Sequence, residues 1–153
     1  MSVNVELNFR RILVSRKGNL ATLDYISDYD RSIGQNFPGL ESFQKIEPSR
    51  YHWVFQRVEQ SGFQIQIRFT TKFSRETSHI LISPDSSSDK SSLRGRWALQ
   101  AKDHLTTVSV EFEFNTELPI PFVLKAVAVP LTQKEIGKLF DRYIENLGKA
   151  LAA

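Results

Sequence analysis

Histidine, cysteine and paired carboxylates are common in catalytic and metal sites, and this sequence places none of them in a recognisable motif. His52, His79 and His104 stand far apart, and none belongs to the H-x-x-x-H or H-x-E spacing that is typical of metal ligands. Cysteine is absent, which excludes thiol nucleophiles, disulfides and cysteine-ligated metal centres. The sequence also lacks a G-x-S-x-G elbow and a G-x-x-x-x-G-K-S/T phosphate loop. We therefore expect no catalytic residue, no metal ligand and no cofactor.

The charged residues that do cluster are expected to face water. Glu111 and Glu113 share one face of a predicted strand, but the alternation places that face outside, where carboxylates serve solubility rather than acid–base catalysis. The basic clusters are Arg10-Arg11, Arg16-Lys17 and Arg94-Gly95-Arg96. A nucleic-acid surface would also need exposed aromatic rings between them, and the aromatic residues alternate to the opposite face. Nucleic-acid binding is therefore disfavoured, although a basic stripe on the outer face stays open as an alternative.

The chemistry that this sequence offers most plainly is apolar and aromatic. Hydrophobic residues make up 41% of the chain, with 11 Phe against one Met. Aromatic residues recur at inward positions, among them Phe69, Trp97, Phe112 and Phe140. Such residues either fill a solid core or line a pocket for an apolar ligand, and the residue pattern leaves both interpretations open.

A predicted strand over residues 51–59 has two alternative registers. If Phe55 faces inward, so do Trp53 and Arg57; the other register points His52 inward. An inward Arg57 would need a carboxylate partner from the protein or the ligand, because a lone buried charge costs several kcal/mol.

The elements that must position these residues are mainly strands. Strict alternation of apolar and polar residues predicts strands with one buried face and one wet face, which is typical of antiparallel sheets. The alternation is clearest over residues 3–10, 63–73, 93–102 and 107–114, with shorter candidates at 40–46, 51–59 and 79–83. The total is about seven strands.

Two helical regions interrupt this pattern. The first is predicted to begin at Asn19 as its N-cap and to place Leu20, Leu23, Ile26 and Tyr29 on one face. A short helical turn over residues 31–37 should follow, because Pro38 and Gly39 then end it.

A long amphipathic helix is predicted near the C-terminus. Thr132-Gln133-Lys134-Glu135 has the pattern of a capping box, with Leu131 and Ile136 as its hydrophobic staple. One apolar face follows, made of Ile136, Leu139, Phe140, Tyr143, Ile144, Leu147 and Leu151. The preceding residues 119–130 contain three prolines and are expected to form a short, weakly anchored and separate helix.

Length and composition indicate a single globular domain over residues 1–153. Lys and Arg number 20 against 17 Asp and Glu, a net charge of +3 that is ordinary for such a domain. The first six residues show no basic region followed by an apolar run, so we expect no signal peptide and a cytoplasmic protein. Residues 83–92 hold six serines and are expected to form an exposed hairpin loop.

The order of these elements resembles the START-like (SRPBCC, helix-grip) superfamily. The resemblance rests on the topology and on two local segments. Residues 26–40, from Ile26-Ser27-Asp28-Tyr29 to Phe37-Pro38-Gly39-Leu40, look like the helix–helix–strand segment of that superfamily. Leu118-Pro119-Ile120-Pro121 and the amphipathic helix that follows look like its last element. The sequence is most similar to the bacterial polyketide cyclase/dehydrase and coenzyme-Q-binding branches.

The resemblance implies an α+β fold of the helix-grip type. A curved antiparallel sheet of about seven strands would wrap around the long C-terminal helix, with two short helices after the first strand. The cavity between sheet and helix would bind an apolar ligand. Its predicted ligand-binding residues are Trp53, Phe55, Ile67, Phe69, Thr71, Trp97, Leu99, Phe112, Ile136, Phe140 and Tyr143. Its predicted entrance residues are Ile120, Phe122, Val123 and Val127.

The leading hypothesis is that the protein binds, and carries, a hydrophobic small molecule or lipid, with a transient membrane contact at the entrance. Two alternatives stay open. One is a polyketide cyclase, aromatase or dehydrase-type enzyme that uses the same cavity, which would require polar groups inside it. The other is a protein- or RNA-interaction module that uses the outer face.

Overall fold

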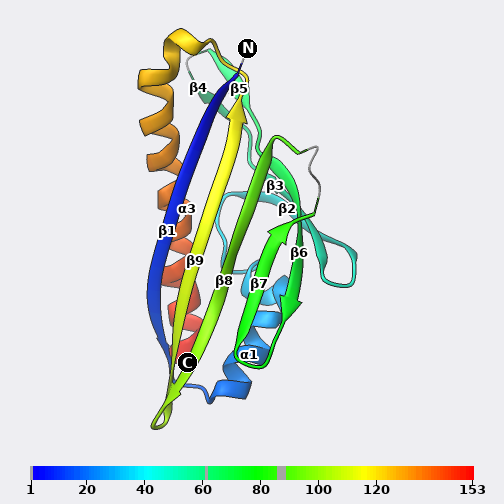
Figure 1. The fold of residues 1–153 in the computed structure, drawn as a ribbon, viewed down its shortest axis with the longest axis vertical. Coiled ribbons are helices and arrows are strands. Elements are labelled where there is room, and N and C mark those ends of the chain that lie inside the picture. Colours follow the sequence, from blue (N-terminus) through cyan, green and yellow to red (C-terminus); the bar gives the residue numbers. More distant parts are fainter. Residues whose placement is uncertain (1, 61, 86–88) are drawn as a thin grey trace.

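A long antiparallel sheet packs along a C-terminal helix of 28 residues in the computed structural model, which describes residues 2–60, 62–85 and 89–153 (Figure 1). Within these residues the main sheet has seven strands in the order β1-β9-β8-β7-β6-β3-β2, all antiparallel. They are β1 (Val3–Ser15), β2 (Leu40–Glu47), β3 (Arg50–Phe55), β6 (Arg68–Arg75), β7 (His79–Pro84), β8 (Ser91–Lys102) and β9 (Leu105–Leu118). The predicted α+β helix-grip architecture is confirmed.

Period-two alternation in the sequence sets the two faces of the sheet. Along β9 every second residue is buried, including Val108, Val110, Phe112 and Phe114. Neighbouring strands match this pattern, as Phe9 of β1 pairs with Phe112. A Cβ atom on Gly95 of β8 would lie 2.0 Å from the carbonyl oxygen of Glu111, so glycine is needed where β8 approaches β9.

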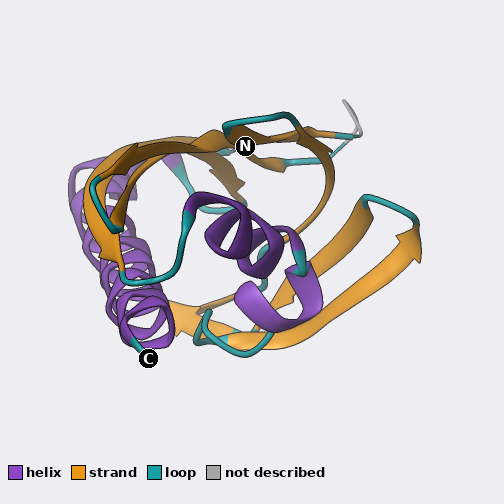
Figure 2. Ribbon diagram, turned by 90° about the horizontal axis from the view of Figure 1, so that it is seen from below, coloured by secondary structure: helices purple, strands orange, loops and turns teal. Residues whose placement is uncertain are grey.

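Two short helices, α1 (Asn19–Ser27) and α2 (Tyr29–Ser32), follow β1, as predicted. Seen along the long axis, the sheet curves, and these helices lie inside the curve beside the C-terminal helix (Figure 2). The predicted N-cap is wrong: Gly18 holds that position, and the buried Oδ1 atom of Asn19 has no hydrogen bond to the described part of the chain. Leu20, predicted to face inward, is 66% exposed. The buried Thr22 instead holds the helix, because its hydroxyl lies 2.8 Å from that of Ser15.

The C-terminal helix α3 (Lys125–Ala152) is continuous through Pro130 and follows a short 3-10 turn, η1 (Phe122–Leu124). The prediction of a separate helix before a capping box is therefore wrong, and Thr132 is buried inside α3. Proline is tolerated because Pro130 lies in the second turn and removes one hydrogen bond, to the carbonyl of the exposed Ala126, where water can replace it. The predicted apolar face packs inward, and Phe140, Tyr143 and Leu147 are fully buried.

Two predicted strands are each interrupted, and the interruptions create a separate hairpin. Residues 51–59 divide into β3 and β4 (Val58–Gln60), and residues 63–73 divide into β5 (Phe63–Ile65) and β6. β4 and β5 pair only with each other in the described structure and lie near the beginning of α3 (Figure 1). At the interruption the amide of Phe55 donates to the carbonyl of Ile67 (2.9 Å). The side-chain amide of Gln66 also donates to the carbonyl of Phe55 (3.1 Å).

No helix in the described ranges combines the length and the apolarity that crossing a bilayer requires. Of the predicted serine-rich loop, Ser83 ends up in β7 and Ser91 and Ser92 in β8, while residues 86–88 lie outside the described residues.

Candidate ligand-binding pocket

Most of the interior between the sheet and α3 is filled by aromatic side chains. Phe140 is fully buried, and its ring centroid lies 5.3 Å from that of Phe9, 5.7 Å from Phe37 and 5.5 Å from Phe112. All eleven predicted ligand-binding residues are buried, and eight of them lie outside the lining of the pocket described below, namely Trp53, Phe69, Thr71, Trp97, Leu99, Phe112, Phe140 and Tyr143. These packed side chains stabilise the fold, and the open space lies outside this core.

The polar atoms inside this core pair with each other. The indole N–H of Trp53 donates to the hydroxyl of Thr71 (2.8 Å), and that of Trp97 donates to the hydroxyl of Tyr143 (3.0 Å). Burial raises the pKa of Tyr143 above its ordinary value, because the phenolate would lose its hydration. Both hydroxyls therefore accept the hydrogen bonds that the buried indole N–H groups require, and they hold the core together.

An open pocket of about 400 Å³ lies at one end of the core, between β3, the β4–β5 hairpin and α3. Three predicted ligand-binding residues, Phe55, Ile67 and Ile136, line it. The full lining is Gly39, Phe55, Gln56, Val58, Glu59, Ile65, Ile67, Leu118, Leu131, Thr132, Glu135, Ile136 and Leu139. The hairpin residues Val58, Glu59 and Ile65 were missed, because residues 51–59 and 63–73 were each predicted as one continuous strand.

Local geometry explains the walls of this pocket. Gly39 has a positive φ of 76°, and a Cβ atom there would lie 3.0 Å from Cδ2 of Leu139. Glycine therefore lets the turn before β2 approach α3 and close one side. Phe55 and Ile67 are buried at the bottom, whereas Val58 is 55% and Leu131 is 41% exposed at the mouth. The pocket is apolar inside and opens between two apolar residues.

The structure shows which residues of β3 face inward. Tyr51, Trp53 and Phe55 are buried on the inner face, and Arg57 is exposed beyond the end of the strand. Arg57 needs no buried partner, because the chain leaves the sheet between Phe55 and Val58.

The predicted entrance residues lie where η1 joins α3, and three of the four are exposed. Phe122 is 62%, Val123 is 83% and Val127 is 64% exposed, whereas Ile120 is buried. Among the described residues, Lys125 is the charged residue that lines the shallow hollow here, and its Nζ atom lies 5.2 Å from the centre of the Phe122 ring. We call Phe122, Val123 and Val127 the apolar patch. Leu131 follows Val127 by one helical turn, so the patch continues to the mouth of the pocket.

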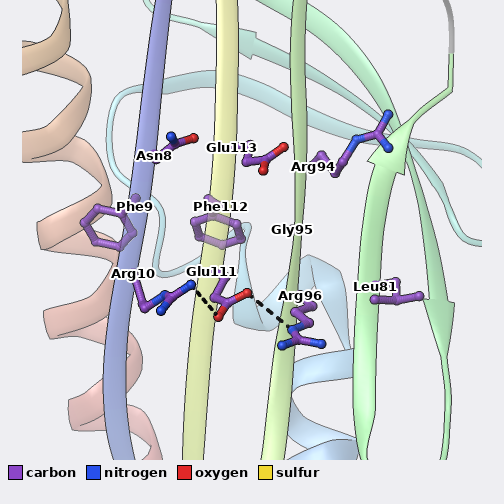
Figure 3. Close-up of a pocket in the computed structure, with 10 residues that line it drawn as sticks. All are labelled: Asn8, Phe9, Arg10, Leu81, Arg94, Gly95, Arg96, Glu111, Phe112 and Glu113. Atoms are coloured by element: carbon purple, nitrogen blue, oxygen red, sulfur yellow. Dashed lines mark ion pairs between the residues drawn. The ribbon is translucent and has the colours of Figure 1, made fainter.

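A second hollow, of about 510 Å³, lies on the outer face of the sheet around Gly95 (Figure 3). The carboxylate of Glu111 there lies 3.2 Å from the guanidinium of Arg10 and 3.4 Å from that of Arg96. Glu111 and Glu113 are thus on the outer face, as predicted, with Arg10, Arg94 and Arg96 around them. Because acidic and basic side chains alternate here, the face has mixed charge.

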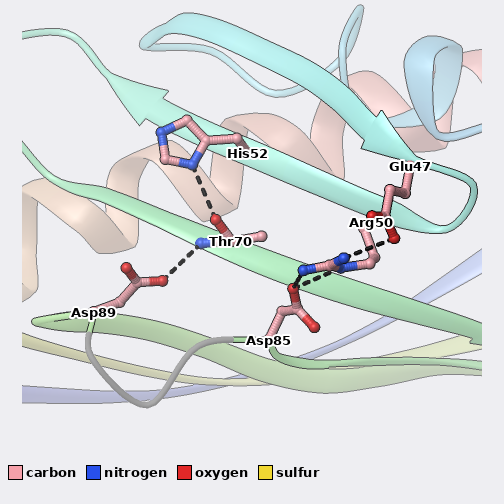
Figure 4. A network of polar contacts seen from close by, with 6 residues as sticks. All are labelled: Glu47, Arg50, His52, Thr70, Asp85 and Asp89. Carbon is pink, nitrogen blue, oxygen red and sulfur yellow. Dashed lines mark hydrogen bonds and ion pairs between the residues drawn. The ribbon is translucent and has the colours of Figure 1, made fainter.

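The histidine with the clearest polar partner lies on the outer face of β3. Nδ1 of His52 is 3.0 Å from the hydroxyl of Thr70, whose amide donates to the carboxylate of Asp89 (3.0 Å; Figure 4). Arg50 pairs with Asp85 and with Glu47 beside this network. No group of three or more acidic or histidine side chains in the described residues is placed to hold a metal ion.

Comparison with known proteins shows which proteins have a similar fold. No protein-family model and no curated protein sequence matches the chain. A START superfamily protein from Mycobacterium smegmatis is 13% identical, with a TM-score of 0.64 over 94% of this chain and 96% of that one. The Zhui aromatase/cyclase from Streptomyces sp. R1128 is 8% identical, with a TM-score of 0.65 over 95% and 93%.

The di-domain ARO/CYC StfQ from the steffimycin biosynthetic pathway is 12% identical, with a TM-score of 0.57 over 97% of this chain and 51% of that one. At these identities the likeness concerns the fold. The sheet order, the long helix α3 and these structural matches show that the chain has the START-like, helix-grip fold, which polyketide aromatase/cyclases share.

Proposed function

We propose that the protein binds and carries a hydrophobic small molecule or lipid in the pocket between β3, the β4–β5 hairpin and α3. The observation that carries this proposal is an apolar opening of about 400 Å³ beside an otherwise filled core. Its volume is within the range of roughly 300–1,000 Å³ that is usual for small-molecule sites. The proposal treats the whole chain as one domain built around this pocket.

The binding energy would come from burial of apolar ligand surface. Burying ~300 Å² at ~25 cal/mol/Å² gives roughly 7–8 kcal/mol before the losses of association. The net affinity would be micromolar, which suits a carrier that must release its ligand.

The apolar patch would be the entrance and the contact with a lipid surface. It is exposed, it continues through Leu131 to the mouth of the pocket, and Lys125 is the charged residue beside it. In that contact the Lys125 stem would lie on apolar surface while its ammonium group stays in water or near anionic head groups.

This proposal is tested by placing a charge at the mouth of the pocket. Val58→Asp should weaken binding of the uncharged fluorescent probe N-phenyl-1-naphthylamine about tenfold, because the new carboxylate must lose water when an apolar ligand enters. Val58 is 55% exposed, so the change should leave folding intact. Val14→Asp, at a 52% exposed position on β1 outside the pocket lining, is the matched control and should bind like the wild type. Absence of saturable binding, or equal binding by both variants, would reject the proposal.

A cyclase or aromatase activity is a second candidate, favoured by the structural likeness to the Zhui aromatase/cyclase. Such chemistry needs an acid or base beside the substrate. Among the described lining residues Glu59 and Glu135 are the groups of that kind, whereas the Tyr143 hydroxyl is occupied in the core. Under this alternative, Glu135→Gln should lower turnover of an aromatic polyketide analogue at least about 100-fold with the substrate still bound. If the protein is a carrier, product analysis by mass spectrometry should find no turnover by the wild type.

A further inference from the structure

The buried part of the pocket lining is hydrocarbon except for one hydroxyl group. Among the described lining residues, those that are buried are Phe55, Ile65, Ile67, Leu118, Thr132 and Ile136. Thr132 is the polar member of this set, and it is 7% exposed. The inner wall formed by these residues is therefore uncharged and presents a threonine side chain to whatever fills it.

Thr132 lies on the face of α3 that packs inward. The buried residues in this part of the helix follow one another at intervals of four, so they share one face; they are Ala128, Thr132, Ile136 and Phe140. Ile136, the next residue on this face, also lines the pocket. The side chain of Thr132 is thus turned toward the pocket, beside Ile136, rather than toward water.

The backbone donors where the strands break are already in use. The amide of Phe55 donates to the carbonyl of Ile67 (2.9 Å), and the amide of Gln56 donates to the carbonyl of Gly39 (2.8 Å). These residues line the same pocket. A polar group of a ligand at this depth would therefore meet the Thr132 hydroxyl rather than a spare amide.

The ionisable lining residues do not reach the inner wall. In the β4–β5 hairpin Val58 pairs with Ile65 and Glu59 pairs with Gln64, so alternation turns the Glu59 side chain to the opposite face from Val58 and Ile65. Glu135 is exposed at the rim. A charged group placed against the inner wall would lose its hydration without meeting an opposite charge from the described lining, and that loss is costly.

Resting on the proposed function, we infer that the ligand is a neutral, largely apolar molecule with a hydroxyl or carbonyl group, and that Thr132 binds this group. A threonine hydroxyl donates one hydrogen bond and accepts up to two, so a contact within the protein leaves it able to bind a ligand as well. It can pair with an alcohol or a ketone, but it cannot neutralise an ammonium, carboxylate or phosphate group. Thr132 is then a specificity residue, and charged ligands are rejected because they cannot recover their hydration.

The experiment compares ligands that share a naphthalene ring and differ in one substituent. At neutral pH, 1-naphthol and 1-methylnaphthalene are uncharged, whereas 1-naphthoate and 1-naphthylmethylamine carry opposite charges. Each would displace bound N-phenyl-1-naphthylamine from the wild type. 1-Naphthol should displace the probe at about tenfold lower concentration than either charged compound, because burial of an uncompensated charge is unfavourable whatever its sign. Equal competition by either charged compound would reject the requirement for a neutral ligand.

Variants at one position show whether Thr132 binds the hydroxyl group. Thr132→Val removes the side-chain hydroxyl and keeps its shape. It should weaken 1-naphthol binding about fivefold, because one hydrogen bond is worth about that factor, and should not weaken 1-methylnaphthalene binding. Thr132→Ser keeps the hydroxyl and should retain the wild-type ratio between these two ligands. The control Thr107→Val makes the same change on the outer face of β9, outside the described pocket lining, and should also keep that ratio.

The outcomes separate this inference from the proposed function. If the probe fails to bind the wild type, the proposed function is wrong. If the probe binds but Thr132→Val keeps the wild-type ratio, weakens both neutral ligands equally, or behaves like Thr132→Ser, the binding proposal stands and this inference is rejected. Unchanged binding of 1-methylnaphthalene by the valine variant shows at the same time that its pocket is intact.

Discussion

Phe140 shows how a single aromatic residue connects the helix to the sheet. Its ring is fully buried and contacts rings from β1, from the segment after α2 and from β9, including Phe114 at 6.1 Å. Because these contacts come from elements far apart in the chain, the residue joins α3 to β1, to β9 and to the segment after α2.

Phe140→Ala should lower the free energy of unfolding by about 3–5 kcal/mol, since it leaves a cavity that the surrounding rings can fill only in part. Urea unfolding followed by circular dichroism measures this loss. Phe122→Ala is the control, because that ring is 62% exposed, and its loss should change stability by less than about 0.5 kcal/mol. Similar values for the two variants would contradict the placement of Phe140.

Buried tyrosines should make the free energy of unfolding decrease at alkaline pH. Burial raises the pKa of Tyr29 and Tyr51 from 10.0 to about 12, and it raises the pKa of Tyr143 as well. The folded protein holds these protons more tightly than the unfolded chain, so the resulting stabilisation is complete below pH 10 and is lost as pH rises through about 12. Urea midpoints should therefore stay level from pH 8.5 to about 10 and fall between pH 10 and 11.5, less steeply in Tyr29→Phe. A midpoint independent of pH over this range would disprove the tyrosine assignment.

Helix α3 has two parts with different anchoring, although it is continuous. Residues 139–147 bury Phe140, Tyr143, Ile144 and Leu147 against the sheet, whereas among residues 125–129 Ala128 alone is fully buried. Pro130 also removes the helical hydrogen bond to the carbonyl of Ala126, which lies in the first part. The first part can therefore open while the second stays packed.

Amide exchange should report this difference. Residues 123–129 should exchange faster than residues 139–147 and should slow when N-phenyl-1-naphthylamine is added, because a bound ligand covers the mouth at Leu131. Mass spectrometry of exchanged peptides gives both rates in one experiment. Equal protection of the two segments, unchanged by the probe, would show that the apolar patch is not a gate.

At the level of the whole molecule, the sheet and α3 enclose more interior than the helix alone can fill. The remaining space is taken largely by the aromatic core and by α1 and α2, which lie inside the curve of the sheet (Figure 2). What stays open is the end beside the β4–β5 hairpin. Among the described residues the fold therefore offers an apolar pocket near the apolar patch and, on the outer face, a separate hollow of mixed charge.

Local patterns were sufficient to predict most of the fold. The alternation through Val108, Val110 and Phe112 correctly identified the buried face of β9, and the apolar face through Phe140 and Leu147 correctly identified the side of α3 that packs on the sheet. These predictions succeed because strand and helix each repeat at a fixed period, so the spacing of apolar residues indicates which side of the element is buried.

The pocket and the ends of the helices could be located only from the three-dimensional structure. The division of residues 51–59 and 63–73 depends on hydrogen bonds such as that from Phe55 to Ile67, which join residues apart in the chain. Pro130 and Thr132 look like a helix boundary locally, yet α3 continues, because packing of the helix on β1 outweighs one lost hydrogen bond. Whether an inward aromatic ring fills a core or lines a pocket depends on which other rings reach the same place, and that is a property of the folded chain.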